Sequence, residues 1–462
     1  MKRYDLVVIG AGSGNTVVDD RFADRSVAII ERGPFGGTCL NRGCIPSKML
    51  VATADRAHDA ATSAPFGVST SYDGADWPAI RDRVFSRLDG IASDGHDYRV
   101  GLDHVTVLDG TARFTGPRRL EVTTDAGTEE LEAGQVVLAV GSRPVVPDVP
   151  GLDEVEVHTS DTVMRLDALP GRIGIIGGGY IGCELAHIFD GLGSEVLQVE
   201  SGEQLLGNQD EEVSEVFTAE VSQRWDVRLE TELSSVRPVD GGRIELGLSQ
   251  GGPEVVDVLL LAVGRVPNTD GIGLDLAGVE TDERGRVVVD AHQRTTAEGV
   301  WALGDASSPE PLKHVANQDA RVVQHNLLHP DRLVESDHRF VPNAVFTHPQ
   351  VASVGLTEAQ ARDRGLDLAV GRNEIGDTAH GWALLEDRTD HRVKLLADRA
   401  TGRLVGAHLI GPQASALVQP LIQAMSFDQP ARGLARGQYW IHPALTETVE
   451  NALLALEDDL DA

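Results

Sequence analysis

The feature that most limits the fold of this chain is a glycine-rich turn that occurs twice. In the first copy, YDLVVIGAGSGN, an apolar run ends in Gly10, Gly12 and Gly14, and the next apolar run, SVAIIERG, ends near Glu31. A strand, a glycine turn, a helix and an acidic-ended strand are typical of a dinucleotide-binding fold, in which the helix N-terminus faces a pyrophosphate and the carboxylate binds a ribose hydroxyl. Asn15 stands where a third glycine is expected, so this copy alone is weak evidence.

The same pattern returns in the middle of the chain. The run RIGIIGGGYIGCE contains Gly177, Gly179 and Gly182, and the run SEVLQVE that follows ends in Glu200. Two copies argue against chance, and they predict two nucleotides bound by one polypeptide.

Later segments complete the predicted architecture. Apolar strands end in glycine at QVVLAVGSRP and VLLLAVGRVP, and each leads to a proline and so to a crossing between domains. The run GVWALGDAS places Asp305 where a carboxylate can accept a hydrogen bond from a sugar-like hydroxyl. From about Phe340, alternating strands and a helical stretch without a glycine turn predict a third unit. The predicted fold class is α/β, with two dinucleotide-binding (Rossmann-like) domains and a C-terminal α+β domain.

Two of the three cysteines lie five residues apart in GGTCLNRGCIPSKML. A chain of 462 residues needs no disulfide for stability, and so short a loop stabilises little, so Cys39 and Cys44 are interpreted as a reactive dithiol. A metal site is disfavoured, because Cys183 is the only other thiol and is expected to be a small buried apolar residue. On a regular helix the two Cα atoms would be roughly 8 to 9 Å apart, beyond the ~7 Å limit of a disulfide. The segment is therefore expected to be bent or only partly helical.

The charge balance narrows the classes of partner. The chain has 72 acidic and 40 basic residues and a net charge of -32, so nucleic acid is not an expected partner. No apolar run reaches the ~18 residues of a membrane span and the N-terminus does not resemble a signal peptide, so we expect no membrane partner and a cytoplasmic protein. Only four basic residues are lysine, and the acidic residues are spread along the chain, which resembles halophilic proteins and predicts a need for high salt. Lys48, beside the cysteine pair, is therefore expected to have a function.

Together these motifs resemble those of the flavoprotein disulfide reductases, the group that includes glutathione reductase, dihydrolipoamide dehydrogenase, mercuric reductase and mycothione reductase. The resemblance rests on GGTCLNRGCIPSK, the two glycine turns, GVWALGDAS and HPALTE, in the family's order over essentially the whole chain. Within the family, IGAGSGN, LKHVANQDARVV and WIHPALTETVENALL look most like mycothione reductases. The halophile-like composition makes the haloarchaeal counterpart, bis-γ-glutamylcystine reductase, the nearest match.

The resemblance implies a homodimer and a division of each chain into four segments. They are an FAD-binding domain in two parts, 1–147 and 266–338, an NAD(P)-binding domain, 148–265, and a dimerisation domain, 339–462. The residues implied to bind FAD are Gly10, Gly12, Gly14, Glu31, Gly37, Thr38, Lys48, Ala112, Gly141, Asp305 and His314. Those implied to bind NAD(P)H are Gly177, Gly179, Tyr180, Gly182, Glu200 and Gly264, and no metal is implied.

The resemblance also implies a catalytic cycle. Hydride passes from the nicotinamide to FAD and on to the disulfide of Cys39 and Cys44. Cys39 then attacks a low-molecular-weight disulfide, most consistently bis-γ-glutamylcystine, and Cys44, which contacts the flavin, resolves the mixed disulfide. His442, oriented by Glu447, protonates the departing thiolate and comes from the other subunit.

The sequence gives conflicting indications about whether the nicotinamide is NADH or NADPH. The resemblance places Lys48 near the flavin, paired with Glu184, and Tyr180 over the ring where the nicotinamide enters. Glu200 argues for NADH, because a carboxylate there binds a ribose 2'-hydroxyl and repels a 2'-phosphate. The mycothione and bis-γ-glutamylcystine reductases typically use NADPH, and we expect NADPH on the whole-chain resemblance.

Other interpretations stay open. Dihydrolipoamide dehydrogenase shares CLNxGCIPSK and often has such a glutamate, whereas mercuric reductase is disfavoured because a C-terminal cysteine pair is absent. A non-catalytic flavin-binding regulatory protein is a different class, and the intact dithiol, Lys48, His442 and Glu447 argue against it. The residues that bind the disulfide substrate come from loops that no motif marks.

Overall fold

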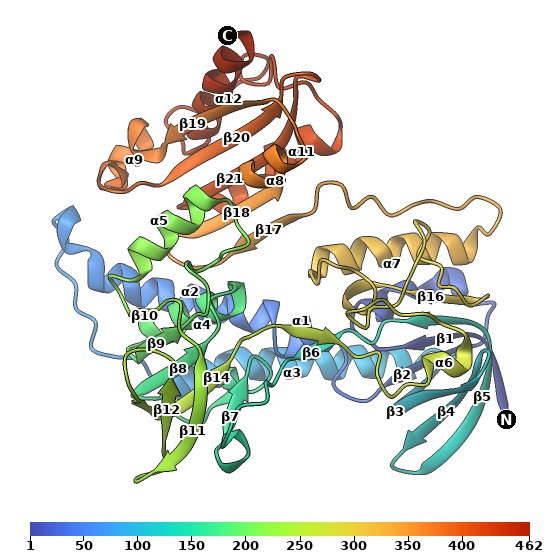
Figure 1. The fold of residues 1–462 in the computed structure, drawn as a ribbon. Coiled ribbons are helices and arrows are strands. Elements are labelled where there is room, and N and C mark those ends of the chain that lie inside the picture. Colours follow the sequence, from blue (N-terminus) through green and yellow to red (C-terminus); the bar gives the residue numbers. More distant parts are fainter.

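The computed structural model describes residues 1–462, and three main sheets divide the chain into three units (Figure 1). The first unit lies at the right of the view, the second at the lower left, and the third, which carries the C-terminus, lies above the second. The strands of these sheets fall within the predicted segments, whose boundaries stay a prediction. None of the helices is both long and apolar enough to cross a membrane.

The first unit is a mainly parallel sheet built around the N-terminal strand. Its strands are β1 (Lys2–Ile9), β2 (Val27–Glu31), β3 (Val105–Gly116), β4 (Arg119–Thr124), β5 (Gly127–Leu138) and β16 (Val300–Ala302). Its helices are α1 (Gly37–Asn41), α2 (Cys44–Thr62), α3 (Trp77–Val100), α6 (Leu274–Ala277) and α7 (Lys313–Leu328). The parallel order is β3-β2-β1-β5-β16, and β4 pairs antiparallel with both β3 and β5. The inner parts of β1 and β2 are continuously buried, as a sheet covered on both faces requires.

The second unit repeats the order of four of these strands, but its outer strand β7 (Val157–Thr159) precedes the others in the chain, whereas β16 of the first sheet follows them. Its parallel strands are β7 (Val157–Thr159), β8 (Arg172–Ile176), β9 (Glu195–Val199), β10 (Asp226–Arg228) and β14 (Val258–Leu261), in the order β10-β9-β8-β14-β7. Its helices are α4 (Tyr180–Gly191) and α5 (Glu211–Val221), and a separate antiparallel sheet contains β11 (Leu233–Val239), β12 (Arg243–Leu248) and β13 (Glu254–Val256). The two glycine turns therefore belong to two sheets that share the order of four of their parallel strands.

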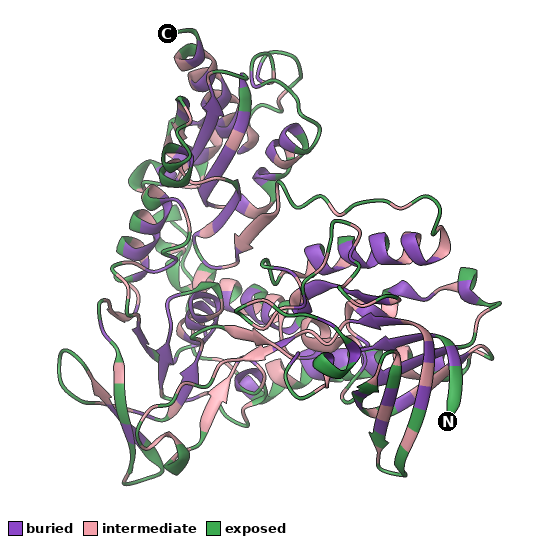
Figure 2. Ribbon diagram, turned by 45° about the vertical axis from the view of Figure 1, so that its right-hand side comes forward, coloured by how far each residue is buried: buried purple, intermediate pink, exposed green.

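The third unit is an antiparallel sheet with helices. Its order is β17-β18-β21-β20-β19. The strands are β17 (Pro342–Val345), β18 (Gln350–Gly355), β19 (Leu368–Glu374), β20 (Arg392–Asp398) and β21 (Arg403–Gly411). The helices are α8 (Glu358–Asp363), α9 (Ala379–Ala383), α10 (Ala414–Leu417), α11 (Gln419–Ser426) and α12 (Thr446–Asp461). Its central strands are buried and its loops exposed (Figure 2), so it is the α+β unit that the sequence predicts.

One of the five buried apolar clusters joins the three units. Leu50 of α2 and Leu185 of α4 belong to the same buried cluster, which also includes Val351 of the third unit. Two short strands, β6 (Ser142–Pro144) and β15 (Arg265–Pro267), pair antiparallel where the chain was predicted to cross between domains. The space between the units is therefore framed by packed elements rather than by loops alone.

One predicted element differs. No α-helix follows the first glycine turn, and two short 3₁₀-helices, Ser13–Val17 and Asp20–Phe22, take its place. β-branched residues such as Val17 lower helix propensity, and the Asp19 side chain accepts a hydrogen bond from the Arg21 N–H, which begins a new turn.

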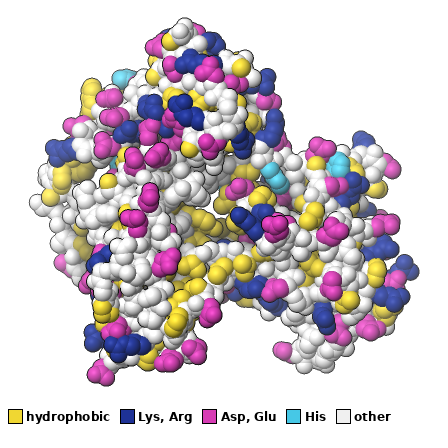
Figure 3. All heavy atoms as spheres, in the orientation of Figure 1, with side chains coloured by type: hydrophobic (Ala, Val, Ile, Leu, Met, Phe, Trp, Pro, Cys, Tyr) yellow, Lys and Arg dark blue, Asp and Glu magenta, His cyan; other side chains and the backbone are white.

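The surface agrees with the charge pattern of the sequence. Asp and Glu side chains are scattered over the face in Figure 3 and alternate with Lys and Arg rather than forming one acidic patch. The predicted dependence on high salt stays a prediction.

Candidate active site

A cavity of 780 Å³ lies where the three units meet. In Figure 3 the molecule is hollowed between the first unit and the other two. The walls include the first glycine turn, the segment 36–48, the N-terminal end of α7 and parts of α4 and β17. Its size is that of a cofactor or ligand site.

The residues predicted to bind FAD gather here. Those that line the cavity are Gly10, Gly12, Glu31, Gly37, Thr38, Lys48, Ala112, Gly141, Asp305 and His314. Gly14 does not line it, because it packs against the sheet, where a Cβ would lie 2.5 Å from the Ala139 Cβ. Whether each residue binds FAD stays a prediction.

Glycine is required in the first turn because the backbones come close. Gly10 has a φ of 104°, and a Cβ there would lie 2.2 Å from the Ala139 carbonyl oxygen. A Cβ on Gly37 would lie 2.8 Å from the Gly12 Cα. The Glu31 carboxylate accepts hydrogen bonds from the backbone N–H groups of Ala11 at 2.7 Å and Gly33 at 2.9 Å. A glycine turn at the end of one strand and a carboxylate at the end of the next strand fit a dinucleotide.

The cysteine pair lies on one wall of this cavity. Cys39 belongs to α1 and Cys44 begins α2, and the helix is broken at Arg42 and Gly43, so the predicted bend is confirmed. Both are free thiols. The hydrogen bond from Cys39 lowers the pKa of Cys44 to about 7 against the effect of burial, and the Lys48 charge acts in the same direction. The same bond and burial raise the pKa of Cys39, so Cys44 carries the first thiolate.

Lys48 is held by residues of all three units. Its ammonium group donates a hydrogen bond to Glu184 of α4, the pair that the resemblance implies. The other carboxylate oxygen of Glu184 accepts a hydrogen bond from the Phe346 N–H at 3.0 Å. The Phe346 ring centroid lies 4.5 Å from the Lys48 Nζ, a cation–π contact. Lys48 is thereby fixed beside Cys44 by an ion pair with a carboxylate that is itself held in place.

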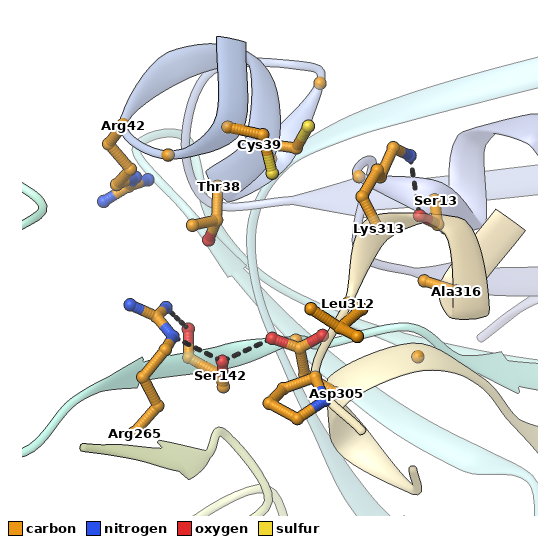
Figure 4. A pocket seen from close by; sticks show the side chains of 18 of the residues that line it. Ser13, Thr38, Cys39, Arg42, Ser142, Arg265, Asp305, Leu312, Lys313 and Ala316 are labelled. Carbon is orange, nitrogen blue, oxygen red and sulfur yellow. Dashed lines mark hydrogen bonds between the residues drawn. The ribbon is translucent and has the colours of Figure 1, made fainter. Parts of the chain in front are cut away.

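Asp305 is oriented by a short chain of hydrogen bonds (Figure 4). Its carboxylate accepts a hydrogen bond from the Ser142 hydroxyl at 2.6 Å. Arg265 donates to the same hydroxyl at 2.9 Å and to the Ser142 carbonyl at 2.8 Å. Because these residues lie on β6 and β15, the crossing between the first two units positions the carboxylate in the cavity.

The second glycine turn repeats the geometry of the first. Gly177 has a φ of 120°, and a Cβ there would lie 2.4 Å from the Ala262 carbonyl oxygen. Glu200 accepts hydrogen bonds from the N–H groups of Gly178 at 2.5 Å and Gly202 at 2.7 Å. A Cβ on Gly182 would lie 2.2 Å from the Gly177 carbonyl oxygen, so α4 needs glycine there to approach the strand.

The residues predicted to bind the nicotinamide are divided between two places. Tyr180 lines the large cavity from the second unit. Gly177, Gly179, Gly182, Glu200 and Gly264 do not line it. Cys183 is fully buried in α4, which raises the pKa of its thiol, so its expected role as a small core residue holds.

His442 and Glu447 form a pair away from the dithiol. The His442 Nδ1 lies 2.6 Å from a Glu447 carboxylate oxygen, and this hydrogen bond lowers the pKa of Glu447. The His442 side chain is 72% exposed, and neither residue lines the cavity. Within one chain, the structure does not bring this histidine to the cysteine pair.

The motifs missed several residues of the site. Ser13, Ser142, Arg265, Lys313 and Phe346 all line the cavity and make the contacts described here or below. Only the scarcity of lysine in the chain could have marked Lys313. The serines and Phe346 carry no signal, since their contacts join residues far apart in sequence.

Comparison with protein families assigns the class. The model "Pyridine nucleotide-disulphide oxidoreductase" matches residues 4–320, and the model of that family's dimerisation domain matches residues 341–453. The chain therefore belongs to the pyridine nucleotide-disulphide oxidoreductase family. It is an NAD(P)H-dependent flavoprotein disulfide reductase with the predicted fold class of two dinucleotide-binding domains and a C-terminal α+β domain.

Individual relatives cover the whole chain. It is 49% identical over 464 residues to mycothione reductase from Mycobacterium tuberculosis, with 99% of this chain and 100% of that protein covered. It is 34% identical over 451 residues to glutathione reductase from Burkholderia cepacia, with coverages of 96% and 97%. The solved structure of the HOCl-induced flavoprotein disulfide reductase RclA from Escherichia coli matches with a TM-score of 0.86, 28% identity and coverages of 98% and 99%. The predicted resemblance to mycothione reductase is confirmed.

Proposed function

We propose that this protein reduces the disulfide of a low-molecular-weight thiol, bis-γ-glutamylcystine, to two thiols by means of the Cys39–Cys44 pair. The observation that carries this proposal is the free cysteine pair on the cavity wall, in which Cys44 has a pKa of about 7 beside Lys48. A thiolate at neutral pH is the reactive form in disulfide exchange. The identity to mycothione reductase supports a small disulfide substrate, and the acidic composition supports the halophile-type thiol.

FAD fits the residues of the cavity. The glycine turn with Gly37 leaves room for a diphosphate, Glu31 suits a ribose, and Asp305 suits a second sugar-like chain of hydroxyls. When bound, FAD accepts a hydride from the nicotinamide and passes two electrons to the cysteine pair. The protein itself fixes Lys48 and Cys44 on the wall of the FAD cavity. It also keeps the thiols of Cys39 and Cys44 within hydrogen-bond distance of each other.

The exchange half of the reaction balances on the two cysteines. Cys39 gives up its proton as it attacks one sulfur of the substrate, the substrate S–S bond breaks, and the first thiol leaves with that proton. Cys44 as thiolate then attacks the Cys39 sulfur, the mixed disulfide breaks, and the second substrate sulfur leaves as a thiolate that takes from solvent the proton that Cys44 had released. The two electrons that reduce the substrate thus come from the dithiol, which becomes a disulfide.

We assign the proton donor to His442 of the partner subunit in a homodimer. Glu447 holds the ring at 2.6 Å, and the exposed segment around it includes Tyr439 and Ile441, apolar side chains that a partner chain would cover. The match to the dimerisation domain supports this arrangement.

The shared site can be tested by mixing two inactive variants. Cys39→Ser subunits and His442→Gln subunits each form inactive homodimers. In a heterodimer with shared sites, one site combines an intact dithiol with an intact histidine, so about half of the activity per dimer returns. Persistent inactivity of a verified heterodimer would place both groups in one chain.

We propose NADPH as the nicotinamide, and the observation against NADPH is the geometry of Glu200. Its carboxylate lies at the end of β9, and the segment that follows, SGEQLLGNQD, contains no arginine for a phosphate. This favours NADH, whereas the resemblance to mycothione reductase favours NADPH.

One set of assays decides substrate and cofactor together. Steady-state rates with bis-γ-glutamylcystine, oxidised glutathione, lipoamide and mycothione are compared with NADH and NADPH at molar salt. The highest kcat/KM for bis-γ-glutamylcystine supports the proposal. Preference for lipoamide would make the protein a dihydrolipoamide dehydrogenase, to which it is 34% identical in Synechocystis. No turnover with any disulfide would favour a flavin-binding protein with a regulatory role in the cytoplasm.

A further inference from the structure

Most cations around the cavity are already neutralised by the protein. Four of the Lys and Arg side chains that line it form ion pairs with carboxylates, and they are Arg42, Lys48, Arg143 and Arg265. Arg32 and Lys313 form none, and Arg32 is exposed to solvent. Lys313 is therefore the one half-buried cation of the cavity without a carboxylate partner.

Lys313 is fixed by a neutral partner. Its Nζ donates a hydrogen bond to the Ser13 hydroxyl at 2.7 Å, and the two other N–H groups of the ammonium stay available. Figure 4 shows this pair and Cys39 on facing sides of one space, with Lys313 on α7 and Cys39 on α1. Lys313 is also the first residue of the 16-residue helix α7, whose N-terminal dipole adds positive potential at that place.

The charge of Lys313 is felt at the exchange thiol. The hydrogen bond with Cys44 and burial raise the pKa of Cys39, and Lys313 opposes them by favouring the thiolate. A chain with a net charge of -32 and four lysines in total keeps one of them, unneutralised, beside the reacting sulfur. Ser13 belongs to the glycine turn that would face the FAD diphosphate, but the charge of Lys313 also acts on Cys39, so an anionic group that arrives there with the substrate would complete the site.

We propose that Lys313 binds an anionic group carried beside the sulfur atoms of the disulfide substrate, and so makes the enzyme select carboxylate-bearing disulfides. This deepens the proposed function and rests on it. In bis-γ-glutamylcystine each cysteine keeps a free carboxylate on the carbon next to the sulfur-bearing carbon. In oxidised glutathione that carboxyl group is part of a peptide bond, and in lipoamide there is no carboxylate. Lys313 is thus a specificity-determining residue, because it binds only a carboxylate that lies close to the disulfide sulfur of the substrate.

The test compares matched disulfides in matched variants. The first pair is bis-γ-glutamylcystine and its analogue with both cysteine carboxyl groups amidated, and the second is dithiobis-nitrobenzoate, which carries carboxylates, and neutral dithiodipyridine. Lys313→Gln is expected to lower the ratio of kcat/KM for the charged over the neutral member about tenfold in the first pair, the size of one lost charge-assisted hydrogen bond, and by less in the second pair, whose carboxylate lies one carbon further from the sulfur. Lys313→Arg should retain most of the ratio. Lys2→Gln, which removes an exposed lysine paired with Glu129, is the control and should leave the ratio unchanged.

Each alternative has its own outcome. An equal loss for charged and neutral disulfides would overturn the proposal and show that Lys313 acts on the Cys39 thiolate alone. Loss of bound FAD from Lys313→Gln, measured as flavin per chain in protein with unchanged circular dichroism, would assign the lysine to the FAD diphosphate instead. If the wild-type enzyme reduces both artificial disulfides but not bis-γ-glutamylcystine, the proposed substrate is wrong. The ratio in the artificial pair still decides the role of Lys313.

Discussion

The two glycine turns are close copies at the strand and diverge immediately after it. In both, a glycine with positive φ packs on the carbonyl of a neighbouring residue, Ala139 for the first and Ala262 for the second, and a carboxylate caps two backbone N–H groups. The second turn then opens the 12-residue helix α4, whereas the first opens only 3₁₀-helices. The strand end and the carboxylate are thus the constant part of a dinucleotide site, and the helix is replaceable.

The 3₁₀ segment after the first turn is stabilised by a side chain from another helix, α3. Arg99 of α3 is buried and donates to the Asn15 side chain at 2.7 Å, the Asn15 carbonyl at 2.7 Å and the Val18 carbonyl at 2.8 Å. One guanidinium group therefore satisfies carbonyls that a continuous helix would have satisfied itself. The second turn has Gly182 where the first has Asn15, and α4 there approaches the strand closely. The first turn therefore has Asn15 bonded to Arg99 where the second has a helix packed closely on its strand.

The largest effect is expected from breaking each turn separately. Gly10→Val forces a Cβ to within 2.2 Å of a carbonyl oxygen, so we expect protein without FAD and a loss of at least ~100-fold in every activity. Gly177→Val introduces an equivalent clash at 2.4 Å but should leave the protein yellow. That variant should lose only the reduction by NAD(P)H, while dithiothreitol still reduces its cysteine pair. Flavin absorbance and rates with each reductant measure both, and a colourless Gly177→Val protein would contradict the division of labour.

The second prediction compares the thiol of Cys44, near the first turn, with the thiol of Cys183, in the second turn, by their effect on the charge-transfer absorbance. As pH rises through about 7, Cys44 loses its proton, so the long-wavelength charge-transfer absorbance of the reduced enzyme should appear above that pH and fade below it. Cys44→Ser should abolish the band, and Cys39→Ser should show it without a reductant. Cys183→Ser, at the buried thiol of the second turn, should leave the band and its titration in place. A band that survives in Cys44→Ser would reverse the assignment of the two thiols.

The sequence predicted the position of those site residues that lie a few residues apart or at the ends of adjacent strands. The glycines, Glu31, Glu200 and the cysteine pair act through spacing of a few residues or through the ends of adjacent strands, so their pattern predicts their place. It failed where a contact joins distant segments. Ser142 holds Asp305 across 163 positions, and the Phe346 N–H holds Glu184 across 162. The missing helix after Asn15 belongs to this second group, because the Arg99 that replaces it lies 84 positions away.

A third, moderate effect tests the two carboxylates. Glu200→Gln can no longer accept hydrogen bonds on two oxygens, so its N–H contacts and any ribose contact weaken, and kcat/KM for NADH should fall about tenfold. The rate with NADPH should fall less, because the repulsion of a 2'-phosphate is removed. The matched change Glu31→Gln should lower FAD retention in dialysis without changing the preference for a nicotinamide. Equal changes for both nicotinamides in Glu200→Gln would show that the carboxylate only supports the backbone.

The smallest expected effect asks whether the first turn can be made more like the second. Asn15→Gly restores the usual third glycine, but it removes the hydrogen bond from Arg99 to the side chain and adds backbone freedom to the unfolded chain. We expect a loss of about 1 kcal/mol, a fall of roughly 2–4 °C in the melting temperature of the FAD-loaded protein. Arg99→Met removes all three bonds and should cost more, because the buried Val18 carbonyl and the partly buried Asn15 carbonyl lose their donor. If Asn15→Gly instead raised the melting temperature, the 3₁₀ turn would be a strained remnant of a helix, whereas a decrease means that Asn15 and Arg99 together are the structure that replaced it.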